Sequence, residues 1–525
     1  LPKKSIQVVI LQVISGVLEA FSVLSLFPLL VIMLKGQFVP EGLFEEFIFN
    51  LFSFFNLDVD IPIVLGLLFF LVITKAFFSY FTGKTVGYTA ASIGRILRSK
   101  LYKSLILSEW LFIIDQKIGE LNTALTNESG RASMAFLYFS HFISGVIIII
   151  VYLIFAFLIS PVATTFAIFS SFLFYLLIKK TLIATKKSGR SITILLRNLG
   201  NTFVETLNGL KSIKAMSQEP VVVKELDLNN KKYEDAQRIR ITNKWILKSM
   251  QEPFIFFILA LAFYILLNFL ETKIEYIFIL IFICSRVLTK INIILSNFQS
   301  ILATQSAFDF IYKNINKAER NQEFIKGKYI SDEIEKIRFD NVQLKYGDKV
   351  VISNINFEIS RGEFITIKGL SGSGKTSIID CLMGFNKPSN GKITFNKHNY
   401  VNLDIKCLRE NIGFVPQDIF LFNGTLEENI TMFTDSPNKT LIENVIEISE
   451  SKTFISKLKD GLNTNIGEKG QKFSGGERQR ISLMRALYRE SSILILDEFS
   501  SALDNFTANK IYRKIKLLKK DKIII

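Results

Sequence analysis

The chain has 525 residues, of which 49% are hydrophobic and 21% are charged, and its mean hydropathy is +0.33. This hydropathy is too high for an ordinary soluble protein and too low for a chain of membrane spans alone, so we expect one membrane domain and one soluble domain. The apolar content and the 10 prolines exclude a disordered chain, and three cysteines without a CxxC pair exclude a disulfide scaffold.

The net charge of +16 raises the possibility of a nucleic-acid partner, but its distribution argues against one. Segment 179–250 carries 15 Lys/Arg against 6 Asp/Glu, whereas segment 35–60 carries one lysine against five acids. Basic residues on one side of apolar segments are the positive-inside pattern of a membrane protein. We therefore expect a membrane-lipid environment and no nucleic-acid partner.

Six apolar runs are each long enough to cross a hydrocarbon core of about 30 Å at about 1.5 Å per helical residue. They cover residues 5–34, 61–82, 133–159, 162–178, 252–270 and 274–295. The connections after the second and fourth runs are long and basic and have helical periodicity, which predicts two helical hairpins in the cytosol and both termini inside. A six-helix channel with ordinary loops is the alternative.

Four charged residues lie in the interior of these runs, away from their ends: Glu19, Lys75, Arg286 and Lys290. A charge at this depth is costly and faces a partner or a wet cavity. Glu19 and Arg286 fall at similar depths, which favours a structural ion pair, and Lys75 and Lys290 could extend to the interface. The alternative is that all four contact an anionic substrate.

The soluble part contains a phosphate-binding motif. Segment 363–368 is predicted to be a buried strand, and it leads into GLSGSGKT at Gly369–Thr376 and a helix over 375–384. This is GxxxxGK[ST] in its strand–loop–helix setting, which predicts ATP and Mg²⁺ as cofactors. Lys375 would reach the β- and γ-phosphates, and Thr376 would bind Mg²⁺. The predicted nucleotide contacts here are Gly369, Ser371, Gly372, Ser373, Gly374, Lys375, Thr376 and Ser377.

A second motif, ILILDE at Ile493–Glu498, predicts a fully buried parallel strand that ends in two acids. Asp497 would hold the Mg²⁺ shell, and Glu498 would polarise the attacking water.

Residues Phe473–Arg480 read FSGGERQR, and this segment resembles the signature of ATP-binding cassette (ABC) transporters. Further segments resemble other motifs of that family: Tyr346 its adenine-stacking aromatic, Gln417 its Q-loop, Thr464–Gly470 its exporter-specific loop and Ser501–Asp504 its D-loop. The resemblance implies that Gln417 acts in catalysis and at the metal. It also implies that Ser474, Gly475 and Gly476 bind ATP from a second protomer.

The resemblance covers nearly the whole chain and implies an ABC exporter half-transporter. Its fold would be an α-helical membrane domain of six long helices plus an α/β P-loop nucleotide-binding domain with a helical subdomain. We expect the membrane domain at 1–318, a linker at 319–335 and the cassette at 336–525. ATP would lie between Lys375 of one protomer and Ser474 of the other, so a second half-transporter is required, and a homodimer is the simplest arrangement.

Two departures from the family pattern stand out. Phe473 replaces the usual leucine, which keeps an apolar residue. The family's switch histidine follows a final strand, but that strand, 522–525, ends the sequence, and neither His141 nor His398 can substitute. We therefore expect the cassette to be C-terminally incomplete and both ends to continue in a longer natural chain.

The resemblance also implies that short helices at the hairpin tips, near Asp115–Leu121 and Asn208–Met216, dock onto the cassettes. The first span resembles that of lipid-linked oligosaccharide flippases over one helix. We expect ATP-driven export or flipping of an amphipathic substrate, a lipid or lipid-linked saccharide, across a bacterial cytoplasmic membrane. Drug or peptide export and an ATP-gated channel or regulator are the alternatives.

Overall fold

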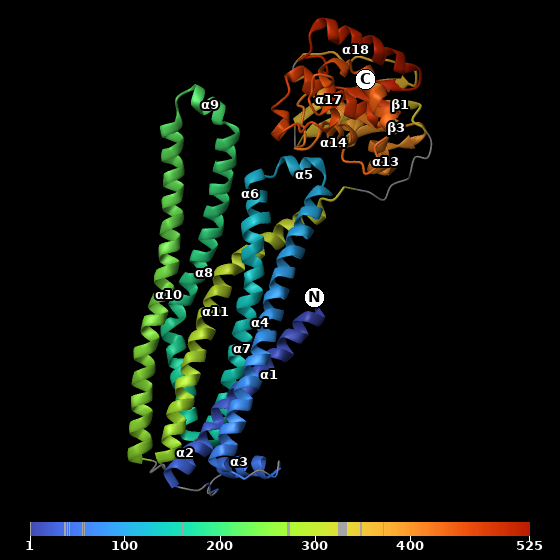
Figure 1. The fold of residues 1–525 in the computed structure, drawn as a ribbon. Coiled ribbons are helices and arrows are strands. Elements are labelled where there is room, and N and C mark those ends of the chain that lie inside the picture. Colours follow the sequence, from blue (N-terminus) through green and yellow to red (C-terminus); the bar gives the residue numbers. More distant parts are fainter. Residues whose placement is uncertain are drawn as a thin grey trace. The chain divides into compact units, whose positions relative to one another are not determined.

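A computed structural model describes residues 2–525 except 36–37, 39, 41–42, 55, 57, 160, 270–273, 324–332, 347–348 and 371. The chain divides into two compact units, drawn with the rest of the fold in Figure 1. The first, the membrane unit, is Leu1–Leu107 with Asp115–Arg320, and the second, the cassette unit, is Ser108–Ile114 with Asn321–Ile525.

The membrane unit is built from helices. They are α1 (Pro2–Leu24), α2 (Leu26–Lys35), α3 (Leu43–Phe54), α4 (Ile61–Ile106), α6 (Ile118–Thr123), the π-helical turn η1 (Ala124–Glu128), α7 (Ser129–Ile159), α8 (Pro161–Asn208), α9 (Leu210–Ala215), α10 (Glu219–Phe269) and α11 (Ile274–Arg320). The first apolar run therefore forms two helices, which meet at Ser25.

Four helical stretches in the described part of the chain are long and apolar enough to cross a membrane. They are Ile6–Met33, Ile61–Ile106, Ile118–Leu158 and Ile168–Asn208. These stretches overlap the first four predicted spans. The fifth and sixth predicted spans fall in α10 and α11, on either side of residues 270–273, which lie outside the described residues.

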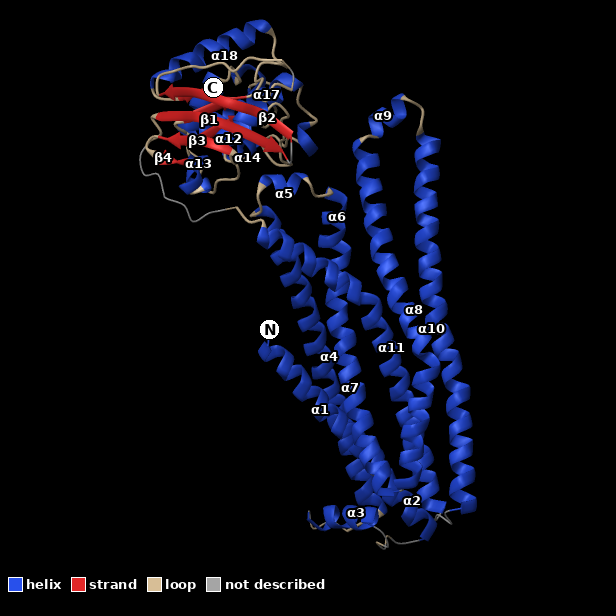
Figure 2. Ribbon diagram, turned by 180° about the vertical axis from the view of Figure 1, so that it is seen from behind, coloured by secondary structure: helices blue, strands red, loops and turns tan. Residues whose placement is uncertain are grey.

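Both long polar connections are helical apart from short breaks near their tips, which agrees with the helical periodicity of their sequences. Helix α8 buries Phe174, Ile178 and Leu182, which recur every four residues, against Leu247 of α10 and Leu295 of α11. This packing holds α8 and α10 side by side as one hairpin, which Figure 2 shows from behind. The tip of this hairpin is α9, within the predicted segment 208–216.

The cassette unit begins with the tip of the other hairpin, the short helix α5 (Trp110–Ile114), which precedes the predicted position 115–121. The Trp110 ring lies 5.6 Å from that of Phe385, and Lys387 Nζ lies 2.7 Å from Glu109 Oε1. This tip therefore packs on the cassette surface within its own chain.

The remaining elements of the cassette unit form two sheets with helices. They are β1 (Lys336–Tyr346), β2 (Lys349–Ser360), α12 (Lys375–Leu382), β3 (Asn390–Phe395), β4 (His398–Asn399), η2 (Tyr400–Asn402), α13 (Ile405–Glu410), β5 (Ile412–Val415), α14 (Leu426–Thr431), α15 (Lys439–Ile448), α16 (Lys452–Ile455), η3 (Gly461–Asn463), η4 (Glu468–Gly470), α17 (Gly475–Tyr488), β6 (Ile493–Leu496), α18 (Asn505–Leu517), η5 (Leu518–Lys520) and β7 (Ile523–Ile524). One sheet has the order β2-β1-β3-β4 and is antiparallel, and the other has the order β5-β6-β7 and is parallel.

Two strands were predicted in the cassette, and the structure confirms one of them. Strand β6 is parallel to both neighbours, and Ile493, Leu494 and Ile495 are at most 1% exposed, which confirms the prediction. The prediction of a buried strand at 363–368 was wrong. Only Phe364 forms a bridge, to Ile524, and none of the six residues is buried.

Candidate nucleotide site and membrane charge cluster

The phosphate-binding loop precedes α12 and has the backbone that its glycines allow. Gly372 and Gly374 have φ of +77° and +92°, and a Cβ on Gly374 would lie 2.3 Å from Ile352 Cγ2. Lys375 Nζ donates to the carbonyl oxygens of Gly369 at 2.9 Å and Leu370 at 3.0 Å. The ammonium group thus lies over the loop, where a phosphate anion would meet it. Ser371 lies outside the described residues.

Two predicted catalytic side chains meet at the carboxyl ends of neighbouring parallel strands. Gln417 follows β5 by two residues, and Glu498 follows β6 by two residues. Gln417 Nε2 donates to Glu498 Oε2 at 2.8 Å. Glu498 has φ of +46°, an uncommon conformation for a residue with a side chain and one that recurs at functional sites.

The acids beside this pair have raised pKa values. Burial, followed by the nearby Glu498 carboxylate, raises the pKa of Asp497. Burial, followed by the charge of Asp497, raises the pKa of Asp380 to about 6. Asp380 was not singled out from the sequence, although it lies one helical turn after Thr376 on α12, and that spacing could have indicated it.

The oxygen donors here fit Mg²⁺, which prefers hydroxyl, carboxylate and amide oxygens. They are those predicted from the motifs: Thr376, Gln417 and Asp497. Bound Mg²⁺ would neutralise negative charge on phosphate oxygens, and its own charge would favour the ionised form of Asp497.

The signature segment opens α17, as its sequence predicts. Ser474 is the N-cap, and it forms a capping box with Glu477: Ser474 N and Oγ donate to Glu477 Oε2 at 2.8 and 2.9 Å. A Cβ on Gly476 would lie 2.9 Å from the carbonyl oxygen of Ala502, so only glycine fits against the D-loop. Phe473 is buried against Phe454, which is consistent with an apolar requirement at that position.

Gln479 is a residue of this region to which the sequence gave no role. It is 3% exposed, and its Nε2 donates to the Glu498 carbonyl oxygen at 3.1 Å and to Ser501 Oγ at 3.0 Å. Its Oε1 accepts from Ala502 N at 3.0 Å. Gln479 therefore ties the signature helix to the backbone of Glu498 and to the D-loop. Tyr346 ends β1, and its side chain lies outside the described residues.

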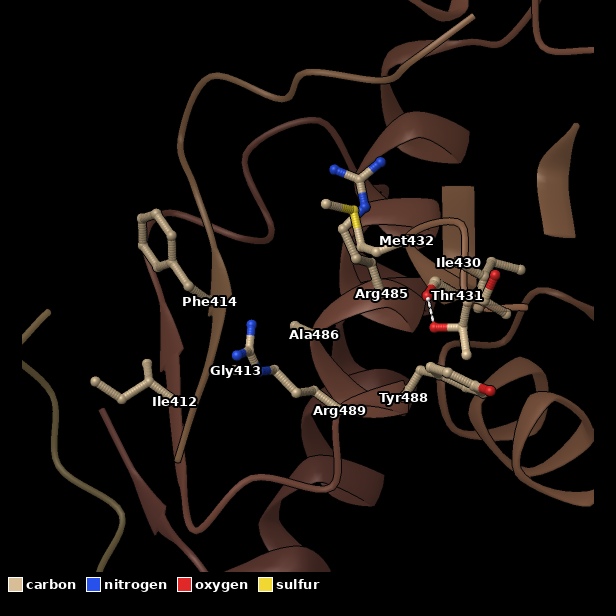
Figure 3. Close-up of a pocket in the computed structure, with 11 residues that line it drawn as sticks. Ile412, Gly413, Phe414, Ile430, Thr431, Met432, Arg485, Ala486, Tyr488 and Arg489 are labelled. Atoms are coloured by element: carbon tan, nitrogen blue, oxygen red, sulfur yellow. Dashed lines mark hydrogen bonds between the residues drawn. The ribbon is translucent and has the colours of Figure 1, made fainter. Parts of the chain in front are cut away.

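A cavity of about 370 Å³ lies elsewhere on the cassette, between β5, α14 and the end of α17 (Figure 3). Phe414 and Met432 provide apolar lining, and Arg485 and Arg489 provide positive charge. Arg485 also donates to the carbonyl oxygens of Asn429 and Phe420, both at 2.9 Å. The cavity thus combines an apolar wall with a fixed cation.

The membrane charges converge more than their separation in sequence indicates. Glu19 of α1 is 12% exposed, and its Oε1 lies 2.6 Å from Lys290 Nζ of α11. Its Oε2 lies 3.5 Å from Lys75 Nζ of α4. The sequence indicated that Lys75 and Lys290 could extend to the interface, whereas the structure brings both lysines to Glu19. The pairing of Glu19 with Arg286 stays a prediction. Depth along a span is countable from the sequence, but the direction in which a helix face points is set by packing.

Two comparisons of the sequence with known families agree with this architecture. The model of the ABC transporter transmembrane region matches residues 6–293, and the model described as ABC transporter matches residues 352–501. This chain belongs to the ABC transporter family. The chain is an ABC exporter in which ATP hydrolysis by the cassette is coupled to export.

Relatives of this ABC exporter include a putative export ATP-binding/permease protein of Rickettsia typhi. It is 27% identical over 87% of this chain and 80% of its own length. An ATP-dependent lipid A-core flippase of Ralstonia nicotianae is 33% identical over 41% of this chain and 36% of its own length. The solved structure of a bacterial Atm1-family ABC exporter with ATP bound shares the fold, with a TM-score of 0.84 and 18% identity over 100% of this chain and 90% of that chain.

Proposed function

We propose that this ABC exporter moves an amphipathic substrate with an anionic head group, a lipid or a lipid-linked saccharide, across a bacterial cytoplasmic membrane. The observation that carries the proposal is the charge cluster of Glu19, Lys75 and Lys290. It places two cations against one carboxylate among apolar helices. The excess positive charge would bind an anion such as a phosphate group.

Arg286 lies one helical turn before Lys290 on the same helix, so the two side chains share a face of α11. A guanidinium group can bind two oxygens of a phosphate at once, which a lysine cannot do. The partial similarity to a lipid A-core flippase supports a lipid substrate.

We assign the nucleotide chemistry to the residues that the motifs predict. Lys375 holds the β- and γ-phosphates, and Tyr346 stacks on the adenine. Glu498 orients the attacking water, and the Gln417 amide holds the Glu498 carboxylate in place. Thr376, Gln417 and Asp497 supply the oxygen ligands of Mg²⁺.

The active form in this proposal is a homodimer, because one chain carries one transmembrane region and one cassette. Ser474, Gly475 and Gly476 of each copy complete the nucleotide site of the other. The cassettes and both hairpin tips lie in the cytosol. The tip α9 docks on the second copy's cassette, at the cavity lined by Phe414, Met432 and Arg485.

The test is ATP hydrolysis by the full chain in lipid nanodiscs with lipid-linked saccharides, peptides or cationic drugs added in turn. We expect stimulation by the anionic lipid-linked saccharides only. Arg286→Ala should remove the stimulation, and Arg286→Lys should restore it in part, because lysine lacks the planar fork. Stimulation by peptides or drugs alone would replace this proposal with a drug or peptide exporter.

A further inference from the structure

The outward surface of α8 carries a row of positive charge just beyond the fourth span. We call these residues the basic stripe: Lys179, Lys180, Lys186, Lys187 and Arg190. All five side chains are exposed. The single acid of α8, Glu205, lies about four helical turns beyond Arg190. The stripe therefore has no neutralising charge on its own helix.

The basic stripe continues the apolar outer face of the same helix. Phe172 and Leu176 are 59% and 49% exposed, and the spacing of seven and three residues places them on the arc of Lys179. The opposite face is buried, with Ile178 at 1% and Leu182 at 6% exposed. One outward arc of α8 thus changes from apolar to basic where the predicted span ends at residue 178. This is the order in which a helix leaves hydrocarbon and enters a layer of head groups.

Helix α10 carries Trp245, Lys244 and Lys248 at the same height along the hairpin as the basic stripe. Its Leu247 packs in one apolar cluster with Ile178 and Leu182 of α8, which fixes the register of the two helices. Trp245 is 57% exposed, and Lys248 Nζ lies 5.0 Å from its ring centroid. Exposed tryptophans beside lysines are typical of the boundary between lipid and water.

We propose that the basic stripe, with Lys244, Trp245 and Lys248 of α10, binds the anionic head groups of phospholipids in the leaflet on the side of the hairpin tips. From Lys179 to Arg190 the helix rises about 16 Å. The first lysines therefore contact the head groups, and Arg190 lies near the distance at which the electrostatic potential of the head groups is screened. Each lysine near an anionic surface strengthens the attraction. This surface is separate from the Glu19 cluster, and the inference does not depend on the exported substrate.

Its position favours a lipid over a nucleic acid or an acidic protein. The cations adjoin an apolar face that suits acyl chains, and the indole of Trp245 lies level with them. A soluble partner would need to reach charges at the edge of the bilayer, whereas lipid head groups are already there.

Trp245 is a built-in reporter for the test, because the chain has two tryptophans and the other is Trp110. The full chain with Trp110→Phe is reconstituted into phosphatidylcholine vesicles that contain brominated phosphatidylglycerol or brominated phosphatidylcholine. Bromine quenches a tryptophan that it touches. We expect the anionic lipid to quench Trp245 more than phosphatidylcholine does. The ratio of the two quenching effects, which we call the selectivity, should be roughly tenfold and should fall at about 0.5 M salt.

The combined variant Lys179→Gln, Lys186→Gln and Lys187→Gln should reduce this selectivity to about one, since each lysine contributes a severalfold factor. The matched control is the double variant Lys231→Gln with Lys232→Gln. These lysines lie on α10 at about 20 Å from Trp245 along the helix axis, so the control should keep the selectivity. Equal quenching by both lipids in the parent protein, or full selectivity in the combined variant, would overturn the proposal. Absence of quenching by either lipid would also overturn it and would indicate that a second copy covers this face.

Discussion

The nucleotide site and the Glu19 cluster both gather charged side chains, but they are assembled differently. The nucleotide site comes from short contiguous motifs, whose backbone places Lys375 over its loop and Gln417 2.8 Å from Glu498. The Glu19 cluster comes from three helices, with partners 56 and 271 positions apart in sequence. Local motifs specify chemistry at one place, whereas helix packing decides which isolated charges meet.

The largest effect is expected from removal of the proposed water-orienting acid, Glu498. Glu498→Gln should leave ATP binding intact and lower kcat by at least about 100-fold, because the amide cannot accept a proton from water. ATP hydrolysis and binding of a fluorescent ATP analogue measure the two effects. Glu410→Gln, an exposed acid of the same cassette, is the control and should hydrolyse ATP normally. Near-normal turnover in Glu498→Gln would contradict the assignment.

The second prediction concerns completion of the site by another copy. Ser474→Arg should lower hydrolysis by about 100-fold and spare nucleotide binding at Lys375, because it adds bulk and charge where the second copy's ATP would lie. Cross-linking of cassettes in the presence of ATP should fail in the same variant. A strictly monomeric protein with full ATPase activity would show that no second copy is needed.

The third prediction tests whether Glu19 is the shared counter-charge of two lysines. Glu19→Gln leaves both ammonium groups uncompensated and should lower the stability of the membrane unit by about 2 kcal/mol. Combining it with Lys75→Gln should recover part of the loss. Thermal unfolding in detergent measures this, with Glu46→Gln on the exposed face of α3 as the control. Unchanged stability in Glu19→Gln would remove its structural role.

The smallest expected effect is a pH dependence in the cassette. The pKa of Asp380 in the folded protein, about 6, lies above its value in the unfolded chain, so the folded state favours the protonated carboxyl group. The stability that this preference contributes at low pH is lost as the pH rises through 6. Asp380→Asn should therefore stabilise the Mg²⁺-free protein above pH 6 by about 1 kcal/mol and flatten the profile between about pH 4 and 6. Denaturant unfolding across this range measures it, and an identical profile in both proteins would contradict the shift.

The sequence predicted the helix α12 after the phosphate-binding loop and the buried strand β6, because such motifs carry their geometry locally. The roles of their side chains in nucleotide binding and catalysis stay predictions. The sequence analysis missed Gln479, whose role depends on the approach of the D-loop to α17. It also predicted a buried strand at 363–368, where none of the residues is buried, because aliphatic content does not reveal what packs on each face of a segment.

In the membrane unit the sequence located the first four spans and the tip α9. It did not predict that Lys75 and Lys290 both contact Glu19, because the rotation of α4 and α11 about their axes follows from packing over their full length. The tip α5 was placed too late in the chain, since the apolar segment at Trp110–Ile114 packs on the cassette and does not extend the helix before it.

The role of the Glu19 cluster is tested by ATP-driven movement of a fluorescent lipid-linked saccharide in proteoliposomes, measured for four proteins in parallel. The full chain should transport it, Glu498→Gln should not, and the combined variant Lys75→Gln with Lys290→Gln should lose transport because its excess positive charge is gone. Lys84→Gln, an exposed lysine further along α4, should transport normally. Wild-type transport by the combined variant would contradict the account, because the anionic head group would then pass without the Glu19 cluster.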